Sequence, residues 1–257
     1  MGFLGGKTAL VTGAGQGVGQ GIAYALAAEG AQIAVAGRTL GKLEASCAEI
    51  RRRGGTAEPF LCDVTVKSDI DGLVEAVVGR FGGIQILVNN AQLVPLGAGA
   101  RHHRRGVPGR RDIRAARQSR LMRACHPYLK GDGVVINLGT AASLRQDLGG
   151  YGAYAAVKEA TRSLTRAAAC EWGLDGIRVN CIIPLAMSKG MEGWIAARPE
   201  EAAAFIATIS DAPGGRLRAG YRPCRGADLR PGLRFRHRPD HRARWRPGLS
   251  PLIGTLQ

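Results

Sequence analysis

Residues 8–30 read Thr-Ala-Leu-Val-Thr-Gly-Ala-Gly-Gln-Gly-Val-Gly-Gln-Gly-Ile-Ala-Tyr-Ala-Leu-Ala-Ala-Glu-Gly. The apolar residues 9–11 predict a short buried strand, and a helix is predicted by the apolar face of Val18, Ile22, Ala25 and Leu26. The glycines between them let the backbone approach a pyrophosphate closely, and the first N–H groups of the following helix attract that anion. This stretch therefore predicts an α/β fold with a dinucleotide lying across the turn.

The spacing of the glycines narrows this prediction. They do not follow G-x-G-x-x-G in any register, but Thr-Gly-x-x-x-Gly-x-Gly is met at Thr12, Gly13, Gly17 and Gly19. This form resembles the short-chain dehydrogenase/reductase family, and within it members that act like 3-oxoacyl-acyl carrier protein reductase. The resemblance implies a Rossmann-type, doubly wound parallel sheet in three layers. It also implies cofactor contacts from Gly13, Gly15, Gln16, Gly17, Val18 and Gly19.

Length and composition set the broad class. At 257 residues the chain suits one dinucleotide-binding domain, residues 1–210, followed by a poorly ordered tail, residues 211–257. We expect a cytoplasmic protein without a membrane partner, because the chain has neither a secretory start nor a run of 18 apolar residues. The six cysteines form no C-x-x-C pair, which favours buried thiols over a metal site or disulfides.

The net charge of +16 comes almost entirely from two stretches. Residues 101–120 hold eight Arg and one Asp, and residues 211–249 hold eleven Arg and three Asp, so together they carry +15. The wider block 97–120 has no Lys, no Glu and no apolar periodicity, whereas the resemblance implies a long amphipathic helix there. The family's closing features, a seventh strand and an Asp-Gly-Gly turn, cannot be recognised in the tail.

Three interpretations of the arginine-rich blocks are open. Arginine-rich segments bind nucleic acid, but aromatic residues are almost absent and no nucleic-acid-binding module is recognisable. Low hydrophobicity with high charge favours disorder. We favour a third hypothesis, out-of-frame translation of a GC-rich coding sequence. Reading the gene in the other two frames tests it, because one of them should restore a helix over 97–120 and a closing strand.

The next two strands carry candidate contacts to the adenosine half of a cofactor. A strand at residues 31–37 is followed by Arg38, and no carboxylate is present at the place where one would accept a hydrogen bond from the NAD 2′-hydroxyl. A basic residue there accommodates the 2′-phosphate, so NADP(H) is favoured and NAD(H) is the alternative. A third strand, residues 56–62, ends in Asp63 and Val64, which resemble the family's contact to the adenine ring.

A fourth strand, residues 84–88, leads to Asn89-Asn90-Ala91, which resembles the family's Asn-Asn-Ala-Gly turn beside the cofactor. Gln92 replaces the glycine of that turn. The resemblance also implies a later Asn that supports a proton-relay water, but no Asn occurs between Ala91 and Ile136. We expect helical order to resume only at Leu121 and to end before His126.

The pair Tyr154-x-x-x-Lys158 follows a fifth strand, residues 134–138. Residues four apart share one face of a helix, and a neighbouring ammonium stabilises a phenolate, so the pair can exchange a proton with a substrate oxygen. A hydroxyl at the end of the preceding strand would polarise that oxygen. By strand register this hydroxyl is Thr140, with Ser143 as the alternative.

The remaining segment supplies the nicotinamide side. A sixth strand, residues 176–183, holds Asn180, which with Pro184 resembles the family's Asn-x-x-x-Pro-Gly segment against the nicotinamide, although Leu185 replaces the glycine. Residues 189–209 resemble the family's substrate-covering helices and are interrupted at Pro199. Apolar residues in them indicate a substrate with apolar character or, equally well, packing against the core.

These features predict an NADP(H)-dependent oxidoreductase that interconverts a small-molecule carbonyl and a secondary alcohol. Tyr154 would be the acid and base, while Lys158 would lower the pKa of Tyr154 and bind the nicotinamide ribose. The alternatives are a catalytically impaired or inactive nucleotide-binding chain and, less favoured, a basic nucleic-acid binder. Homo-oligomers are expected if the regions around 97–125 and the tail allow the family's contacts. No metal is predicted.

Overall fold

A computed structural model of the chain describes residues 2–92, 114–140, 143, 152–184 and 189–207. All of them belong to one compact unit that spans Met1–Pro223. Most of the arginine-rich block at 97–120, the boundary predicted at residue 210 and the whole tail lie outside the described residues. The out-of-frame hypothesis and the expectation that the family's seventh strand is missing or altered are therefore still predictions.

Within the described residues, six parallel strands form one sheet in the order β3-β2-β1-β4-β5-β6. Their bounds are β1 (Thr8–Thr12), β2 (Gln32–Gly37), β3 (Thr56–Leu61), β4 (Ile86–Asn89), β5 (Val134–Leu138) and β6 (Arg178–Ile182). The chain winds outward from β1 to β3, returns to pair β4 with β1, and winds outward again in the opposite direction. Ligands of such sheets bind at the carboxyl ends of the strands, where the order reverses between β1 and β4.

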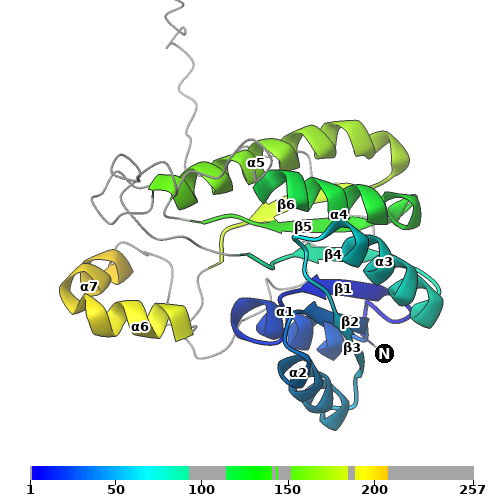
Figure 1. Cartoon of the computed structure of the whole chain (residues 1–257), viewed down its shortest axis with the longest axis horizontal. Helices are drawn as coiled ribbons and strands as arrows, with labels where there is room; N and C mark the ends of the chain where they lie inside the picture. The colour runs from blue at the N-terminus through cyan, green and yellow to red at the C-terminus, as the bar shows by residue number, and fades with distance from the viewer. Residues whose placement is uncertain (1, 93–113, 141–142, 144–151, 185–188, 208–257) are drawn as a thin grey trace, which may run out of the picture. The chain divides into compact units, whose positions relative to one another are not determined.

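Helices cover both faces of this sheet (Figure 1). The covering helices are α1 (Gly17–Ala28), α2 (Leu40–Arg52), α3 (Lys67–Phe81), α4 (Arg114–Leu129) and α5 (Gly152–Trp172), whereas the later helices α6 (Lys189–Ala197) and α7 (Pro199–Ala207) contact each other. On one face α1 and α2 contact β1, β2 and β3, whereas on the other face α4 contacts both α3 and α5. The predicted three-layer, doubly wound fold is confirmed.

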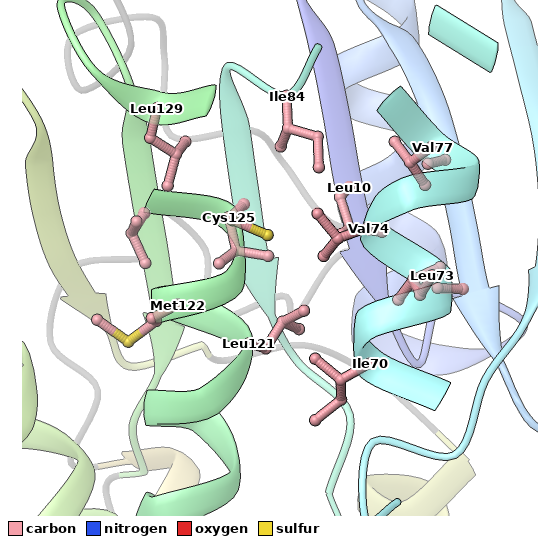
Figure 2. Packing of buried hydrophobic residues seen from close by; sticks show 14 of the residues in the cluster. Leu10, Ile70, Leu73, Val74, Val77, Ile84, Leu121, Met122, Cys125 and Leu129 are labelled. Carbon is pink, nitrogen blue, oxygen red and sulfur yellow. The ribbon is translucent and has the colours of Figure 1, made fainter. Parts of the chain in front are cut away.

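The core on the second face lies between α3, α4 and the sheet (Figure 2). The two helices contribute residues at helical spacing, each at most 4% exposed: Ile70, Leu73, Val74 and Val77 from α3, and Leu121, Met122, Cys125 and Leu129 from α4. Full burial of such a side chain contributes about 1.5–3 kcal/mol. This cluster therefore holds α4 on the sheet even though the helix begins with arginine.

The bounds of α4 correct two predictions. The helix begins at Arg114, inside the 97–120 block, instead of at Leu121. The four glycines and the proline of that block all precede residue 114, and the Arg, Ala and Gln that follow are good helix formers. The helix also continues past His126 to Leu129, because Pro127 in its last turn removes only one helical hydrogen bond.

Other expected elements lie close to their predicted places. Helix α3 ends at Gly82, which adopts the left-handed conformation, and the predicted break at Pro199 separates α6 from α7. Cys47, Cys62 and Cys125 are buried as expected, but Cys170 is exposed. None of the helices in the described ranges is long and apolar enough to cross a membrane.

Candidate active site at the carboxyl edge of the sheet

The glycine turn between β1 and α1 has two separate requirements for glycine. Gly13 and Gly17 have φ angles of 66° and 62°, a conformation that L side chains rarely adopt. At Gly19 space is the limit, because a Cβ there would lie 2.3 Å from Nδ2 of Asn90 and 2.6 Å from the carbonyl oxygen of Gly13. A turn this tight brings backbone N–H groups rather than side chains to its surface, which fits a pyrophosphate.

The predicted turn after β4 is tied to the glycine turn. Asn90 Nδ2 donates to the carbonyl oxygens of Thr12 and Gly13, at 2.9 and 3.2 Å. The Thr12 hydroxyl accepts from the N–H groups of Asn90 and Ala91, both at 3.1 Å, and donates to the carbonyl of Val88 at 3.2 Å. The ends of β1 and β4 are thus fixed to each other at the point where the strand order reverses.

The start of α1 is arranged for an anion. Gln16 stands at the N-cap in an extended conformation and its side chain makes no capping hydrogen bond; instead its Oε1 accepts from Lys42 Nζ at 2.7 Å. The first N–H groups of a helix have no partner within the helix and lie at its positive end. A Cβ on Gly15 would lie 3.0 Å from the Cβ of Lys42, so the turn also lies close against α2.

The predicted adenosine contacts differ in their surroundings. Arg38 is exposed directly after β2. Asp63 shapes the loop after β3, since its Oδ1 accepts from the N–H of Thr65 at 2.9 Å and its own N–H donates to Asp69 at 3.1 Å. Val64 instead faces the pocket described next.

A pocket of about 60 Å³ opens at the carboxyl edge, between the end of β1 and α5. Its lining comes from the ends of β1 and β4, the loop after β3, and the facing sides of α4 and α5: Thr12, Val64, Asn89, Ala91, Gln92, Gln118, Leu121, Val157, Lys158 and Thr161. Four predicted site residues, Val64, Asn89, Ala91 and Lys158, are thereby brought together. Their sequence separation reaches 94 positions, so the fold alone joins them.

Tyr154 and Lys158 lie on the same side of α5. The Lys158 Nζ is 5.8 Å from the centre of the Tyr154 ring and donates to the carbonyl of Leu138 at the end of β5. Lys158 is 4% exposed, and this burial lowers the pKa of its ammonium from 10.5 to about 8, against a smaller opposite effect of Cys181. Tyr154 is half-buried.

The two candidate hydroxyls make different contacts. Thr140 is half-buried directly after β5. The single proton of the Ser143 hydroxyl has two acceptors within reach, the carbonyl oxygen of Thr140 at 2.9 Å and the Glu159 carboxylate. Burial acts to raise the pKa of Glu159, but the bonds from Ser143 and Arg162 outweigh it and leave this pKa below its ordinary value.

The nicotinamide side is described in part. Pro184 is half-buried after β6, while Leu185 lies outside the described residues. Met191, Trp194 and Ile195 of α6 are half-buried, and so is Ile206 of α7.

Sequence reasoning missed Gln118, Leu121 and Thr161 as pocket residues. Gln118 was assigned to the block without periodicity, although it stands three and four residues before Leu121 and Met122. That spacing puts it on the buried side of a helix. Extending the apolar pattern of α4 backwards could have found it.

A parallel sheet of this order with a glycine turn at its switch point defines a dinucleotide-binding α/β protein. The chain belongs to the short-chain dehydrogenase/reductase family, since a family model described as enoyl-(acyl carrier protein) reductase matches residues 13–217. Its relatives are named as dehydrogenases and reductases, and the chain is accordingly an oxidoreductase.

Individual relatives cover most of the chain. A 12α-hydroxysteroid dehydrogenase of Clostridium sp. is 36% identical over 235 residues, which span 84% of this chain and 86% of the relative. A sorbitol dehydrogenase of Cereibacter sphaeroides is 36% identical over 184 residues, 70% of each chain. A short-chain dehydrogenase of Burkholderia cenocepacia, crystallised in complex with NADP, has a TM-score of 0.71 at 27% identity, covering 84% of this chain and 86% of that one.

Proposed function

We propose that this chain is an NADP(H)-dependent oxidoreductase that interconverts a carbonyl and a secondary alcohol. One observation carries the proposal. Tyr154 and the buried Lys158 share one side of α5, and Lys158 lines a pocket together with Asn89 and Ala91. A group that exchanges protons and a nucleotide-binding edge are what this reaction needs in one place.

Lys158 and Tyr154 have separate tasks in the proposal. When bound, the nicotinamide supplies or takes up the hydride. In the reducing direction the carbonyl carbon gains this hydride and Tyr154 gives its proton to the oxygen; in the oxidising direction both move back. An ammonium at Lys158 stabilises the phenolate that remains. The Leu138 carbonyl holds this ammonium on the side of α5 that faces the strand ends.

Thr140 is proposed as the hydroxyl that polarises the substrate oxygen. Its position directly after β5 supports this role, because strand ends at this edge face the pocket side of the sheet.

NADP(H) is proposed over NAD(H) as the cofactor. Arg38 stands exposed after β2, where it can pair with a 2′-phosphate. The NADP complex of the Burkholderia cenocepacia relative supports the choice by analogy. The same molecule is proposed to be held by the remaining predicted contacts: Gly13, Gly15, Gln16, Gly17, Val18, Gly19, Asp63, Val64, Asn89, Asn90, Ala91 and Pro184.

The proposed substrate is a secondary alcohol, or the corresponding ketone, on an apolar skeleton. Half-buried Met191, Trp194 and Ile195 in the region that resembles substrate-covering helices support it. The name of the Clostridium relative, a 12α-hydroxysteroid dehydrogenase, points to the same class.

The experiment measures NADPH and NADH binding by fluorescence titration, followed by turnover with a panel of hydroxysteroids, apolar ketones and polyols. We expect NADPH to bind more tightly than NADH and at least one apolar ketone to be reduced. Tyr154→Phe should keep NADPH binding and lose turnover by about 10²- to 10⁴-fold. NADPH binding without turnover on any substrate would favour the impaired-chain alternative, and no binding of either nucleotide would refute the proposal.

A further inference from the structure

A buried ring of hydrogen bonds lies directly beneath the pocket. Eight polar or charged residues are buried among those that the structure describes, and five of them, Asn89, Asn137, Lys158, Thr161 and Thr165, gather where α5 meets the ends of β4 and β5. Buried polar groups are costly unless they are hydrogen bonded. Five buried polar or charged residues in one cluster therefore need hydrogen-bond partners, and we ask what the cluster does for the site.

The hydrogen bonds run from strand to strand and then to α5. Asn89 Nδ2 donates to Asn137 Oδ1 at 2.8 Å, and Asn137 Nδ2 donates to the Thr165 hydroxyl at 2.9 Å. That hydroxyl donates to the carbonyl oxygen of Thr161, one turn earlier on α5, at 2.7 Å. The chain of bonds therefore links β4, β5 and α5.

Gln118 of α4 closes the ring. Its Oε1 accepts from the Thr161 hydroxyl at 2.8 Å, while its Nε2 lies 3.5 Å from the backbone carbonyl oxygen of Asn89. It also lines the same pocket as Lys158. The Gln118 side chain thus connects α4, α5 and β4 beside Lys158.

The spacing along α5 connects this ring to the reaction. Tyr154, Lys158, Thr161 and Thr165 stand at i, i+4, i+7 and i+11, which is one side of a single helix. Hydrogen bonds at Thr161 and Thr165 fix the rotation of α5 about its axis and its position along that axis. They therefore also fix where Tyr154 and Lys158 lie. A displacement of about 1 Å in such groups can cost about 100-fold in rate.

We propose that Gln118 is a positioning residue, which holds α5 so that Tyr154 and Lys158 face the carboxyl ends of β4 and β5. The inference rests on the proposed function, which supplies the reaction to be positioned. Gln118 acts through Thr161.

The test compares Gln118→Ala, Thr161→Val, their double variant, the conservative Thr161→Ser, and Arg123→Ala as the control at an exposed position of the same helix. We expect each of the first two variants to lower kcat about tenfold while the substrate KM and the NADPH Kd change less than twofold. The kcat of the double variant should also fall about tenfold, because both changes remove the same hydrogen bond between Gln118 and Thr161. Thr161→Ser and Arg123→Ala should keep at least half of the wild-type kcat.

A second readout does not depend on turnover. In protein labelled with ¹³C at lysine Cε, NMR titration follows the ammonium of Lys158, whose burial holds its pKa near 8. Gln118→Ala and Thr161→Val should raise this pKa by about one unit toward 10.5, because water reaches a lysine that is no longer held against β5. Thr161→Ser and Arg123→Ala should leave it unchanged.

The outcomes separate the two proposals. If the wild-type chain turns over no substrate, the proposed function fails, and the lysine titration alone decides the positioning. An unchanged Lys158 pKa in both Gln118→Ala and Thr161→Val would overturn the positioning proposal. Losses of kcat that multiply in the double variant, or a change confined to KM or Kd, would overturn it as well.

Discussion

The two sides of the candidate pocket are held together by different means. At the glycine turn the side chains of Thr12 and Asn90 bind backbone groups, and Gly19 lies so close to Asn90 that a Cβ has no room there. Beside α5 the contacts are side-chain hydrogen bonds through Asn137 and Thr165. The glycine side should therefore be sensitive to an added side-chain atom, and the α5 side to the loss of a hydrogen-bond partner.

The largest effect should come from adding one methyl group to the glycine side. Gly19→Ala places a Cβ 2.3 Å from Asn90 Nδ2 and 2.6 Å from a backbone oxygen, so the ends of β1 and β4 must separate. We expect the free energy of unfolding to fall by about 3 kcal/mol and NADPH binding to weaken at least about 30-fold, on the order of 2 kcal/mol. Urea unfolding and fluorescence titration measure the two losses.

Gly72→Ala is the matched control, because nothing lies within 4 Å of a Cβ at that helical position. It should leave NADPH binding unchanged. Equal losses in the two variants would show that the close contact at Gly19 does not matter.

Removing a partner on the α5 side should have a somewhat smaller effect. Asn137→Ala leaves the Asn89 amide and the Thr165 hydroxyl without their buried partner, and each orphaned group costs about 1–3 kcal/mol. We expect a loss of about 2 kcal/mol in the free energy of unfolding by urea. NADPH binding should change far less than in Gly19→Ala, and an equally large loss of binding would remove the distinction between the two sides.

A substitution of Lys158 should raise the free energy of unfolding, whereas the two preceding substitutions lower it. The Lys158 pKa of about 8 lies below the ordinary 10.5, so at pH 7 the folded state carries the full cost of a buried cation. Between pH 8 and 10.5 the folded state releases this proton while the unfolded chain keeps it, and the cost disappears as pH rises. We expect Lys158→Met to raise the free energy of unfolding by about 1–2 kcal/mol at pH 7, after the loss of the bond to the Leu138 carbonyl.

This gain should shrink between pH 8 and 10.5 in urea unfolding series. The same variant should lose turnover. A gain that stays constant up to pH 10.5 would contradict the assigned cause, the burial of the ammonium.

The smallest effect concerns cofactor choice at the outer end of the glycine side. Arg38→Ser removes an exposed cation without disturbing the core. We expect NADPH affinity to fall about tenfold, on the order of 1.4 kcal/mol, and NADH affinity to stay within twofold. Parallel titrations with the two nucleotides measure the ratio, and an equal change for both would refute a role for Arg38 at the 2′-phosphate.

The sequence predicted the local pieces of this protein well. Strand, turn and helix at residues 8–30 follow from the glycines and from the apolar periodicity, and the predicted break at Pro199 separates α6 from α7. Tyr154 and Lys158 share a helix side because the spacing of four requires it. The sequence-based prediction was wrong at α4. Because arginine is so abundant in the 97–120 block, no helix was predicted there, although α4 begins at Arg114.

What the sequence by itself determined were those features that depend on neighbours within one helical turn or one strand: the glycine turn, the α/β alternation and the Tyr–Lys pair. Only the tertiary structure decided that Gln118 reaches Thr161, 43 residues away, and that Gly19 meets Asn90. The physical reason is that packing and hydrogen bonding act over a few ångströms in space, and residue spacing along the chain does not specify which distant segments come that close.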